Sequence, residues 1–348
     1  MDCAMQQTLI RRDNMDDNVL KITGLQVFFY TEEGEVRAVD GVSFAIKRGR
    51  IMALVGESGC GKSVTAYSIL KLIQKPGKIG GGSIQLFPKD KEPIDITALT
   101  EKSNMLYTVR GGLVSMVFQE PMTALSPVHT VGNQVCEAIL LHQAVSKQRA
   151  REMAIDILSK VGIPGAGKRI DQYPFEMSGG MRQRVVIAMA LVCRPELLIA
   201  DEPTTALDVT IQAQIIGLMK ELIQSMGTSI LLITHDLSVV AQMADDVAVM
   251  YLGRVVEQGS VRTIIKNPRH PYTMGLLASL PGVHKHEKKR LSSIPGSVPS
   301  LTRIPKGCPF HPRCEYCKPG VCDIGSVPTL QSVAEDHTVA CLRAGEIA

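Results

Sequence analysis

Apolar and polar positions along the chain follow two spacings, one typical of strands and one typical of helices. Residues 19–30 and 36–46 alternate apolar and polar side chains on either side of the turn EEGE, which predicts an antiparallel β-hairpin. Four short apolar runs have the length of buried strands. They lie at 51–55, 197–200, 230–233 and 247–252.

Helical spacing separates these runs. Residues 63–73 repeat apolar positions at helical period directly after the first run, and residues 133–162 predict further helices. Strands that alternate with helices predict an α/β fold with a parallel sheet, interrupted by a helical insert at about 120–180. We expect a tail at 1–18, a nucleotide-binding domain at 19–265 and a C-terminal extension at 266–348, where proline and glycine become frequent.

Composition and charge narrow the class of protein. The 348 residues are 45% hydrophobic, which is enough for a full core. No apolar run reaches the roughly 18 residues that a membrane-spanning helix needs, and residues 1–20 do not resemble a secretory signal. We therefore expect a cytoplasmic location. A net charge of +4 does not indicate a nucleic-acid partner.

The strongest chemical signal is GESGCGKS, residues 56–63, between a predicted strand and a predicted helix. Small residues let backbone N–H groups surround phosphate oxygens at a helix N-terminus. Lys62 adds positive charge near the β and γ phosphates, and the Ser63 hydroxyl can bind Mg²⁺. The predicted phosphate loop comprises Gly56, Glu57, Ser58, Gly59, Cys60, Gly61, Lys62, Ser63 and Val64.

A pair of acids follows the apolar run at 197–200, in LLIADEPTTALD. Asp201 can hold the magnesium shell, and Glu202 can orient and polarise an attacking water. An acid pair after a strand is by itself more often a helix cap or a surface turn. Together with a phosphate loop, the pair predicts a nucleoside triphosphatase.

A second anion site is predicted at SGGMRQR, residues 178–184. Ser178 can cap the helix that follows, and its hydroxyl and the amides of Gly179 and Gly180 can face a phosphate. One chain does not need two γ-phosphate sites. The second site therefore predicts action on a nucleotide that a neighbouring subunit holds.

These motifs, with MVFQE, TALD and ITHD in the same order, resemble the nucleotide-binding domain of an ABC ATPase over roughly residues 19–265. The resemblance implies that ATP and Mg²⁺ bind, that Gln119 contacts magnesium and water, and that His235 contacts the γ-phosphate. It implies that Asp208 crosses a dimer interface. Adenine would stack on Tyr30 or on Phe29. Met177 and Met181 depart from the common LSGGQ signature.

The remaining segments NPRHPYTMGLLASLP, SIPGSVPSL and GCPFHPRC resemble the ATP-binding subunits of bacterial dipeptide and oligopeptide importers. This resemblance implies a peripheral protein on the cytoplasmic face of the membrane. Its implied partners are a paralogous ATP-binding subunit, two membrane-spanning permease subunits and an extracytoplasmic solute-binding protein. A homodimer of ATP-binding chains stays open. So does transport of nickel, glutathione or another solute.

Five of the nine cysteines fall near the C-terminus, and in a reducing compartment such a cluster predicts a metal site rather than disulfides. The resemblance selects Cys308, Cys314, Cys322 and Cys341, with Cys317 as an alternative ligand. Four thiolates suit zinc or a [4Fe–4S] cluster. Irregular gaps and three prolines favour the cluster. A soluble ABC ATPase with a zinc-binding nucleic-acid tail is a weaker alternative, because the second CxxC is missing.

Overall fold

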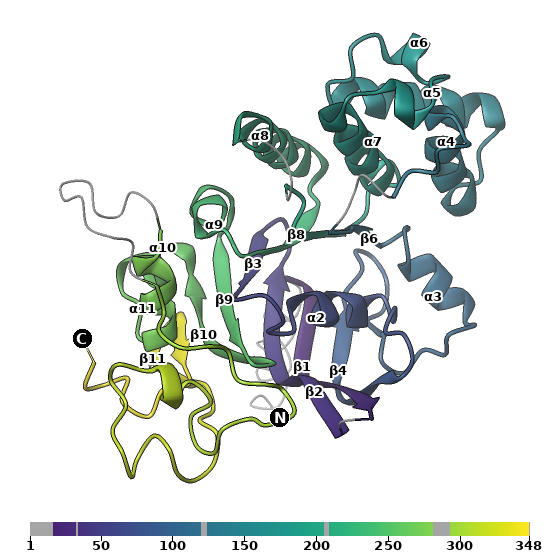
Figure 1. Ribbon diagram of the computed structural model, residues 1–348. Coiled ribbons are helices and arrows are strands. Elements are labelled where there is room, and N and C mark those ends of the chain that lie inside the picture. The colour runs from purple at the N-terminus through teal and green to yellow at the C-terminus, as the bar shows by residue number, and fades with distance from the viewer. Residues whose placement is uncertain (1–16, 33, 120–123, 205–208, 281–292, 348) are drawn as a thin grey trace, which may run out of the picture. The chain divides into compact units, whose positions relative to one another are not determined.

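The computed structural model describes residues 17–32, 34–119, 124–204, 209–280 and 293–347 (Figure 1). The chain divides into two compact units, each built from segments that are distant in sequence. One unit comprises residues 1–20, 46–50 and 85–232. The other comprises residues 21–45, 51–84 and 233–348.

Most of the predicted N-terminal hairpin lies in the second unit, and its ends at 18–20 and 46–47 belong to the first. Strands β1 (Asn18–Thr31) and β2 (Gly34–Lys47) are neighbours in one sheet, and β4 (Gly77–Leu86) pairs with β1 on its other side. Val19, Ile22, Leu25 and Val27 of β1 are buried. The alternating apolar pattern of the sequence therefore becomes one buried face of this sheet.

A second sheet in the same unit carries strand β3 (Ile51–Val55), whose five residues are all buried. It runs parallel to β9 (Asp246–Tyr251), and β9 pairs with β10 (Arg254–Ser260) in antiparallel register. The C-terminal segment adds β12 (His337–Val339) to β10, and β11 (Gln331–Ala334) to β12. The C-terminal region thus continues the sheet that contains β3.

Short helices complete the second unit. Helix α2 (Lys62–Ile69) follows β3 through a glycine loop, as the sequence predicts. The other helical segments are α9 (Leu237–Met243), α10 (Val261–Lys266), α11 (Pro271–Ala278) and the 3₁₀ turn η2 (His311–Arg313).

The first unit pairs β6 (Val114–Val117) with β7 (Leu197–Asp201) in parallel register. All five residues of β7 are buried, which agrees with its continuous apolar run. The short elements β5 (Ile94–Asp95) and α3 (Asn104–Val109) precede β6. Helix α8 (Val209–Met226) follows β7, and β8 (Ser229–Thr234) crosses the division between the units.

The predicted helical insert is a group of helices in the first unit (Figure 1). It contains α4 (Val131–His142), α5 (Lys147–Lys160), α6 (Ala166–Arg169), the 3₁₀ turn η1 (Pro174–Glu176) and α7 (Gly179–Leu191). Helices α4, α5 and α7 pack on one another. Thr130 and Ser146 cap α4 and α5 by accepting hydrogen bonds from backbone N–H groups, which fixes where each helix begins.

Candidate functional site

The phosphate loop lies between β3 and α2, and two of its glycines have no room for a side chain. Gly56 has φ +154°, and a Cβ there would lie 2.3 Å from the Met250 carbonyl oxygen. Gly61 caps α2 with φ +103°, and a Cβ there would lie 2.2 Å from the Ala38 carbonyl oxygen. The loop therefore packs backbone against backbone. Any residue other than glycine at these two positions would have to displace a neighbouring backbone segment.

Lys62 is the first residue of α2, and its side chain is folded onto the loop. Its Nζ donates hydrogen bonds to the carbonyl oxygens of Gly56 at 2.8 Å and Glu57 at 3.0 Å. Lys62 is buried, so water screens its positive charge less than it would at the surface. Burial raises the pKa of the neighbouring Cys60 thiol, although the Lys62 charge opposes this shift. Cys60 is therefore a neutral packing residue of the loop.

The remaining loop residues surround this lysine in different environments. Ser58 and Gly59 are exposed, whereas Ser63 and Val64 are half-buried on α2. The loop thus presents an exposed edge at Ser58 and Gly59, and Ser63 stands one residue after Lys62.

Glu57 has two partners that sequence reasoning did not identify. Its backbone N–H donates a hydrogen bond to the Tyr272 hydroxyl at 2.8 Å. Its carboxylate accepts two hydrogen bonds from Arg313, at 2.7 and 2.9 Å. Both partners belong to the C-terminal region, and no local motif marks either of them.

Two further predicted residues lie in the second unit. His235 is exposed directly after β8. Tyr30 is exposed near the end of β1, and Lys78 Nζ lies over its ring, 4.7 Å from the centroid. Phe29 is half-buried, and its ring packs against the backbone of Gly77. Of the two candidate aromatic platforms, Tyr30 presents the more accessible ring.

The acid pair stands at the end of β7 in the first unit. Asp201 is completely buried. Glu202 has φ +46°, a left-handed backbone that is rare and strained for a residue with a side chain. Gln119, which follows β6, donates from Nε2 to Glu202 Oε2 at 3.4 Å. Parallel pairing of β6 and β7 brings the two predicted side chains together, because their carboxyl ends meet at one sheet edge.

Helix α7 begins at the glycine pair predicted from the sequence. Ser178 is its N-cap and accepts a hydrogen bond from the Met181 N–H at 3.4 Å. Gly179 and Gly180 are the first two residues of α7, and a Cβ at Gly180 would lie 3.4 Å from the Ile211 side chain. Buried Gln183 was not singled out by sequence reasoning, and it donates from Nε2 to the Pro203 carbonyl oxygen. Asp208 lies outside the described residues.

The tail cysteines are free thiols, and the predicted metal site does not form as a compact group. Within the described ranges, which include all five, no three His, Cys, Asp or Glu side chains are arranged to hold a metal ion. Burial raises the pKa of Cys308 and of Cys314 to about 11, because desolvation disfavours the thiolate. Neighbouring thiols raise both pKa values further, among them Cys341.

Backbone hydrogen bonds nevertheless bring the cysteine segments near one another. The Cys308 N–H donates to the Cys322 carbonyl oxygen at 2.8 Å, and the Cys317 N–H donates to the Cys314 carbonyl oxygen at 3.1 Å. The Lys318 N–H donates to Cys322 Sγ at 3.4 Å.

None of the helices in the described parts of the chain is long and apolar enough to cross a membrane.

Comparison with protein families gives two matches along the chain. Residues 39–205 match the ABC transporter family, a range that contains the phosphate loop and the acid pair. Residues 256–322 match the oligopeptide/dipeptide transporter C-terminal region, a range that contains Tyr272 and Arg313.

Curated relatives cover nearly the whole chain. The oligopeptide transport ATP-binding protein OppD of Bacillus subtilis is 49% identical over 92% of this chain and 87% of its own length. The dipeptide transport ATP-binding protein DppD of Bacillus subtilis is 50% identical over 93% of this chain and 94% of its own.

Solved structures agree with this fold. The ATP-binding cassette MJ0796, in a dimeric post-hydrolysis state with ADP and Pi, superimposes with a TM-score of 0.60. It is 26% identical and matches over 70% of this chain and 99% of its own. With near-complete coverage at about half identity, the chain belongs to the ABC transporter family, in the group of ATP-binding proteins that carry the oligopeptide/dipeptide transporter C-terminal region.

Proposed function

We propose that this chain is the ATP-hydrolysing motor subunit of an ABC importer for dipeptides or oligopeptides. The observation that carries the proposal is the phosphate loop, in which buried Lys62 is folded onto the Gly56 and Glu57 carbonyl oxygens at a helix N-terminus. The peptide substrate is supported by the names of the relatives, which extend over the C-terminal region as well.

We assign roles on both units. Residues 56–64 bind the phosphates of ATP, and Tyr30 is the adenine platform because its ring is exposed. Glu202 polarises the attacking water, with Gln119 beside it at 3.4 Å. His235 contacts the γ-phosphate. Ser178, Gly179 and Gly180 act on a nucleotide held by the neighbouring subunit, together with Asp208.

The side chains proposed for magnesium are oxygen donors, which Mg²⁺ prefers. They are the hydroxyl of Ser63, the side-chain amide of Gln119 and the buried carboxylate of Asp201. Bound magnesium would neutralise negative charge on the phosphates.

The proposed assembly follows from the presence of two anion sites on one chain. Two ATP-binding chains associate head to tail, so that each signature reaches the partner's nucleotide. The other members are two permease subunits and an extracytoplasmic solute-binding protein, and this chain lies on the cytoplasmic face of the membrane.

The test is Glu202→Gln in the assembled transporter. The amide keeps the shape of the side chain but lacks the carboxylate that polarises water, so we expect ATP turnover to fall by about 10²-fold or more. Affinity for MgATP should stay within a few-fold of the parent. Turnover close to that of the parent would remove Glu202 from this role. A parent protein that does not bind MgATP would overturn the function itself.

For the tail, we propose that Cys308, Cys314, Cys322 and Cys341 hold a [4Fe–4S] cluster. The support is that backbone hydrogen bonds bring the cysteine segments near one another: the Cys308 N–H donates to the Cys322 carbonyl oxygen at 2.8 Å, and the Cys317 N–H donates to the Cys314 carbonyl oxygen at 3.1 Å. A single zinc ion would need sulfur atoms about 4 Å apart. Thiolates on a [4Fe–4S] cluster bind different irons and stand farther apart, so the two cofactors require different spacings of the four sulfur atoms.

Anaerobic purification tests this cofactor. We expect a brown protein with about four irons per chain and broad absorption near ~400 nm. The variant Cys317→Ser should keep the iron, whereas Cys322→Ser should lose it. A colourless preparation with about one zinc per chain would replace the cluster by zinc and leave the ATPase function untouched.

A further inference from the structure

The C-terminal region reaches the phosphate loop through two side chains that meet at one residue, Glu57. The first is Tyr272 in the first turn of α11. Its side chain is completely buried, and its hydroxyl accepts the Glu57 N–H at 2.8 Å. Glu57 is the residue that follows Gly56, so this hydrogen bond fixes the backbone where the loop leaves β3.

The second side chain is Arg313 at the end of η2, and it binds the Glu57 carboxylate with both ends of its guanidinium. Nη1 lies 2.7 Å from Oε2 and Nη2 lies 2.9 Å from Oε1. Its Nε donates to the Pro295 carbonyl oxygen at 3.0 Å. The Arg313 side chain is 4% exposed and the Glu57 side chain 27%, so the arginine end of this two-pronged ion pair is shielded from water, and its geometry is specific.

Aromatic rings hold both partners in place. The guanidinium of Arg313 lies over the rings of Tyr251 and Phe310, 5.9 and 6.0 Å from their centroids. The Tyr272 ring is tilted against the same two rings, at 4.7 and 5.4 Å. The two side chains that touch Glu57 therefore share one packed aromatic cluster.

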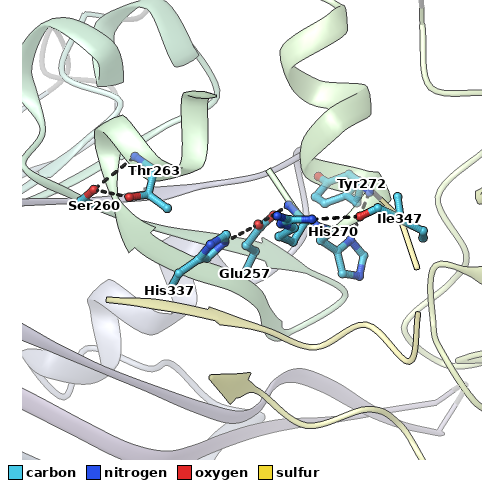
Figure 2. Close-up of polar contacts among 8 residues, drawn as sticks. Glu257, Ser260, Thr263, His270, Tyr272, His337 and Ile347 are labelled. Atoms are coloured by element: carbon cyan, nitrogen blue, oxygen red, sulfur yellow. Dashed lines mark hydrogen bonds and ion pairs between the residues drawn. The ribbon is translucent and has the colours of Figure 1, made fainter. Parts of the chain in front are cut away.

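A buried polar network anchors the start of α11, as Figure 2 shows. The fully buried carboxylate of Glu257 pairs with His337 of β12 at 2.7 Å and accepts the N–H groups of Arg269 and His270. His270 in turn caps α11, because its Nδ1 accepts the Tyr272 N–H at 3.1 Å. The position of Tyr272 thus depends on strand β12 of the C-terminal region.

Glu57 links this framework to the phosphate-binding lysine. Its carbonyl oxygen accepts a hydrogen bond from Lys62 Nζ at 3.0 Å, beside that of Gly56 at 2.8 Å. A shift of the backbone at Glu57 would therefore move a carbonyl group that orients the Lys62 side chain.

We infer that Arg313 and Tyr272 are positioning residues for nucleotide binding: they hold Glu57, and through it Lys62, in the geometry that receives the phosphates. The C-terminal region therefore sets the affinity of the phosphate loop for ATP. This role is separate from that of the cluster proposed for the tail cysteines. This inference rests on the proposed function, since it takes ATP as the ligand of the loop.

Tyr272→Phe is the sharpest test, because it removes one hydroxyl and keeps the ring in its cluster. The Glu57 N–H loses its acceptor, and ATP must then order the loop by itself. We expect MgATP to bind about fivefold more weakly by calorimetry. Tyr316→Phe, an exposed tyrosine of the same region, is the matched control and should bind like the parent.

Arg313→Met tests the second contact. We expect about tenfold weaker binding of both MgATP and MgADP, with partial recovery in Arg313→Lys, which keeps a charge but not the two-pronged geometry. Arg343→Met removes an arginine of the same region that pairs with Glu346, and it should bind like the parent. In the assembled transporter, the KM for ATP should rise in Arg313→Met while kcat stays within about twofold.

The outcomes separate this inference from the proposed function. If the parent binds MgATP and both Tyr272→Phe and Arg313→Met bind it equally well, the inference is wrong and the function stands. If Arg313→Met is unstable, Tyr272→Phe decides. Weaker binding could also be accompanied by a matching fall in the unfolding temperature measured without nucleotide. If Arg313→Lys then restores neither, both residues act in folding alone. A parent that fails to bind MgATP overturns both proposals.

Discussion

At the scale of single residues, the phosphate loop depends on glycines for two different reasons. Gly56 and Gly61 have no space for a side chain, because a Cβ at either position would lie within 2.5 Å of a backbone carbonyl oxygen. Gly59 has φ +78° but nothing within 4 Å of a Cβ, so only its backbone angle favours glycine. Sequence motifs do not distinguish these two causes, and stability measurements do.

We predict that Gly56→Ala lowers the free energy of unfolding by about 3 kcal/mol, because the strained backbone and the clash with Met250 add up. Gly59→Ala should cost about 1 kcal/mol, from its backbone angle alone. Chemical unfolding without nucleotide measures both. Equal costs for the two variants would contradict the steric explanation.

His270 is the residue for which we predict a pH dependence of stability. Burial lowers its pKa to about 3, whereas an imidazole in the unfolded chain titrates near ~6.5. Between these values the unfolded chain binds more protons, so stability falls as pH falls below about 6.5. His270→Asn keeps an acceptor for the Tyr272 N–H but does not titrate. The free energy of unfolding of this variant should therefore lack the part of its pH dependence that comes from His270.

Between pH 7 and pH 5 we expect the parent to lose about 2 kcal/mol relative to His270→Asn. Urea unfolding of both proteins at each pH measures the difference. Parallel pH profiles would mean that His270 is not held neutral in the folded protein.

At the scale of elements, two helices with the same type of N-cap allow a controlled comparison. Ser178 caps α7 and Ser146 caps α5, each by accepting a hydrogen bond from a backbone N–H three residues later. Only α7 begins with two glycines, and we propose that its N-terminus acts on a partner's nucleotide.

We predict that Ser178→Arg prevents ATP-dependent association of the ATP-binding subunits and leaves MgATP binding to the isolated chain nearly unchanged. A bulky cation opposes the helix dipole at that end and fills the space for a phosphate. Ser146→Arg loses the same kind of cap, at about 1 kcal/mol, but should associate normally. Light scattering with and without ATP measures association. Loss of MgATP binding by isolated Ser178→Arg would place the serine in the chain's own site.

At the scale of the whole molecule, two anion sites on one chain predict a pair of ATP-binding chains. Co-expression with the neighbouring subunits, followed by native mass spectrometry, should give two ATP-binding chains and two permease subunits. We expect one copy of this chain and one of a paralogue. Two copies of this chain would establish a homodimer and would leave the role of the signature unchanged.

Local sequence was sufficient wherever the determining contacts are short-range. The strand, glycine loop and helix at 51–69 were all predicted, because apolar burial and the backbone freedom of glycine act within a few residues. The N-cap at Ser178 was predicted for the same reason, since its hydrogen bond spans three residues.

Contacts between distant residues were predicted only where a family motif marked both partners. Gln119 and Glu202 are 83 residues apart, and each belongs to a motif, so both were expected at the site. The tail thiols were also selected by the resemblance to the importer subunits. Whether they converge on a cluster depends on turns and backbone pairing at Cys308 and Cys322 that spacing does not specify.

By itself, the sequence determined the strand, glycine loop and helix at 51–69, the buried strand β7 and the N-cap at Ser178, because each is built from neighbours along the chain. The tertiary structure decided what holds the loop. Glu57 and Arg313 are 256 residues apart and belong to no common motif. They meet where Arg313 packs over the rings of Tyr251 and Phe310, and such packing depends on the whole unit rather than on local sequence.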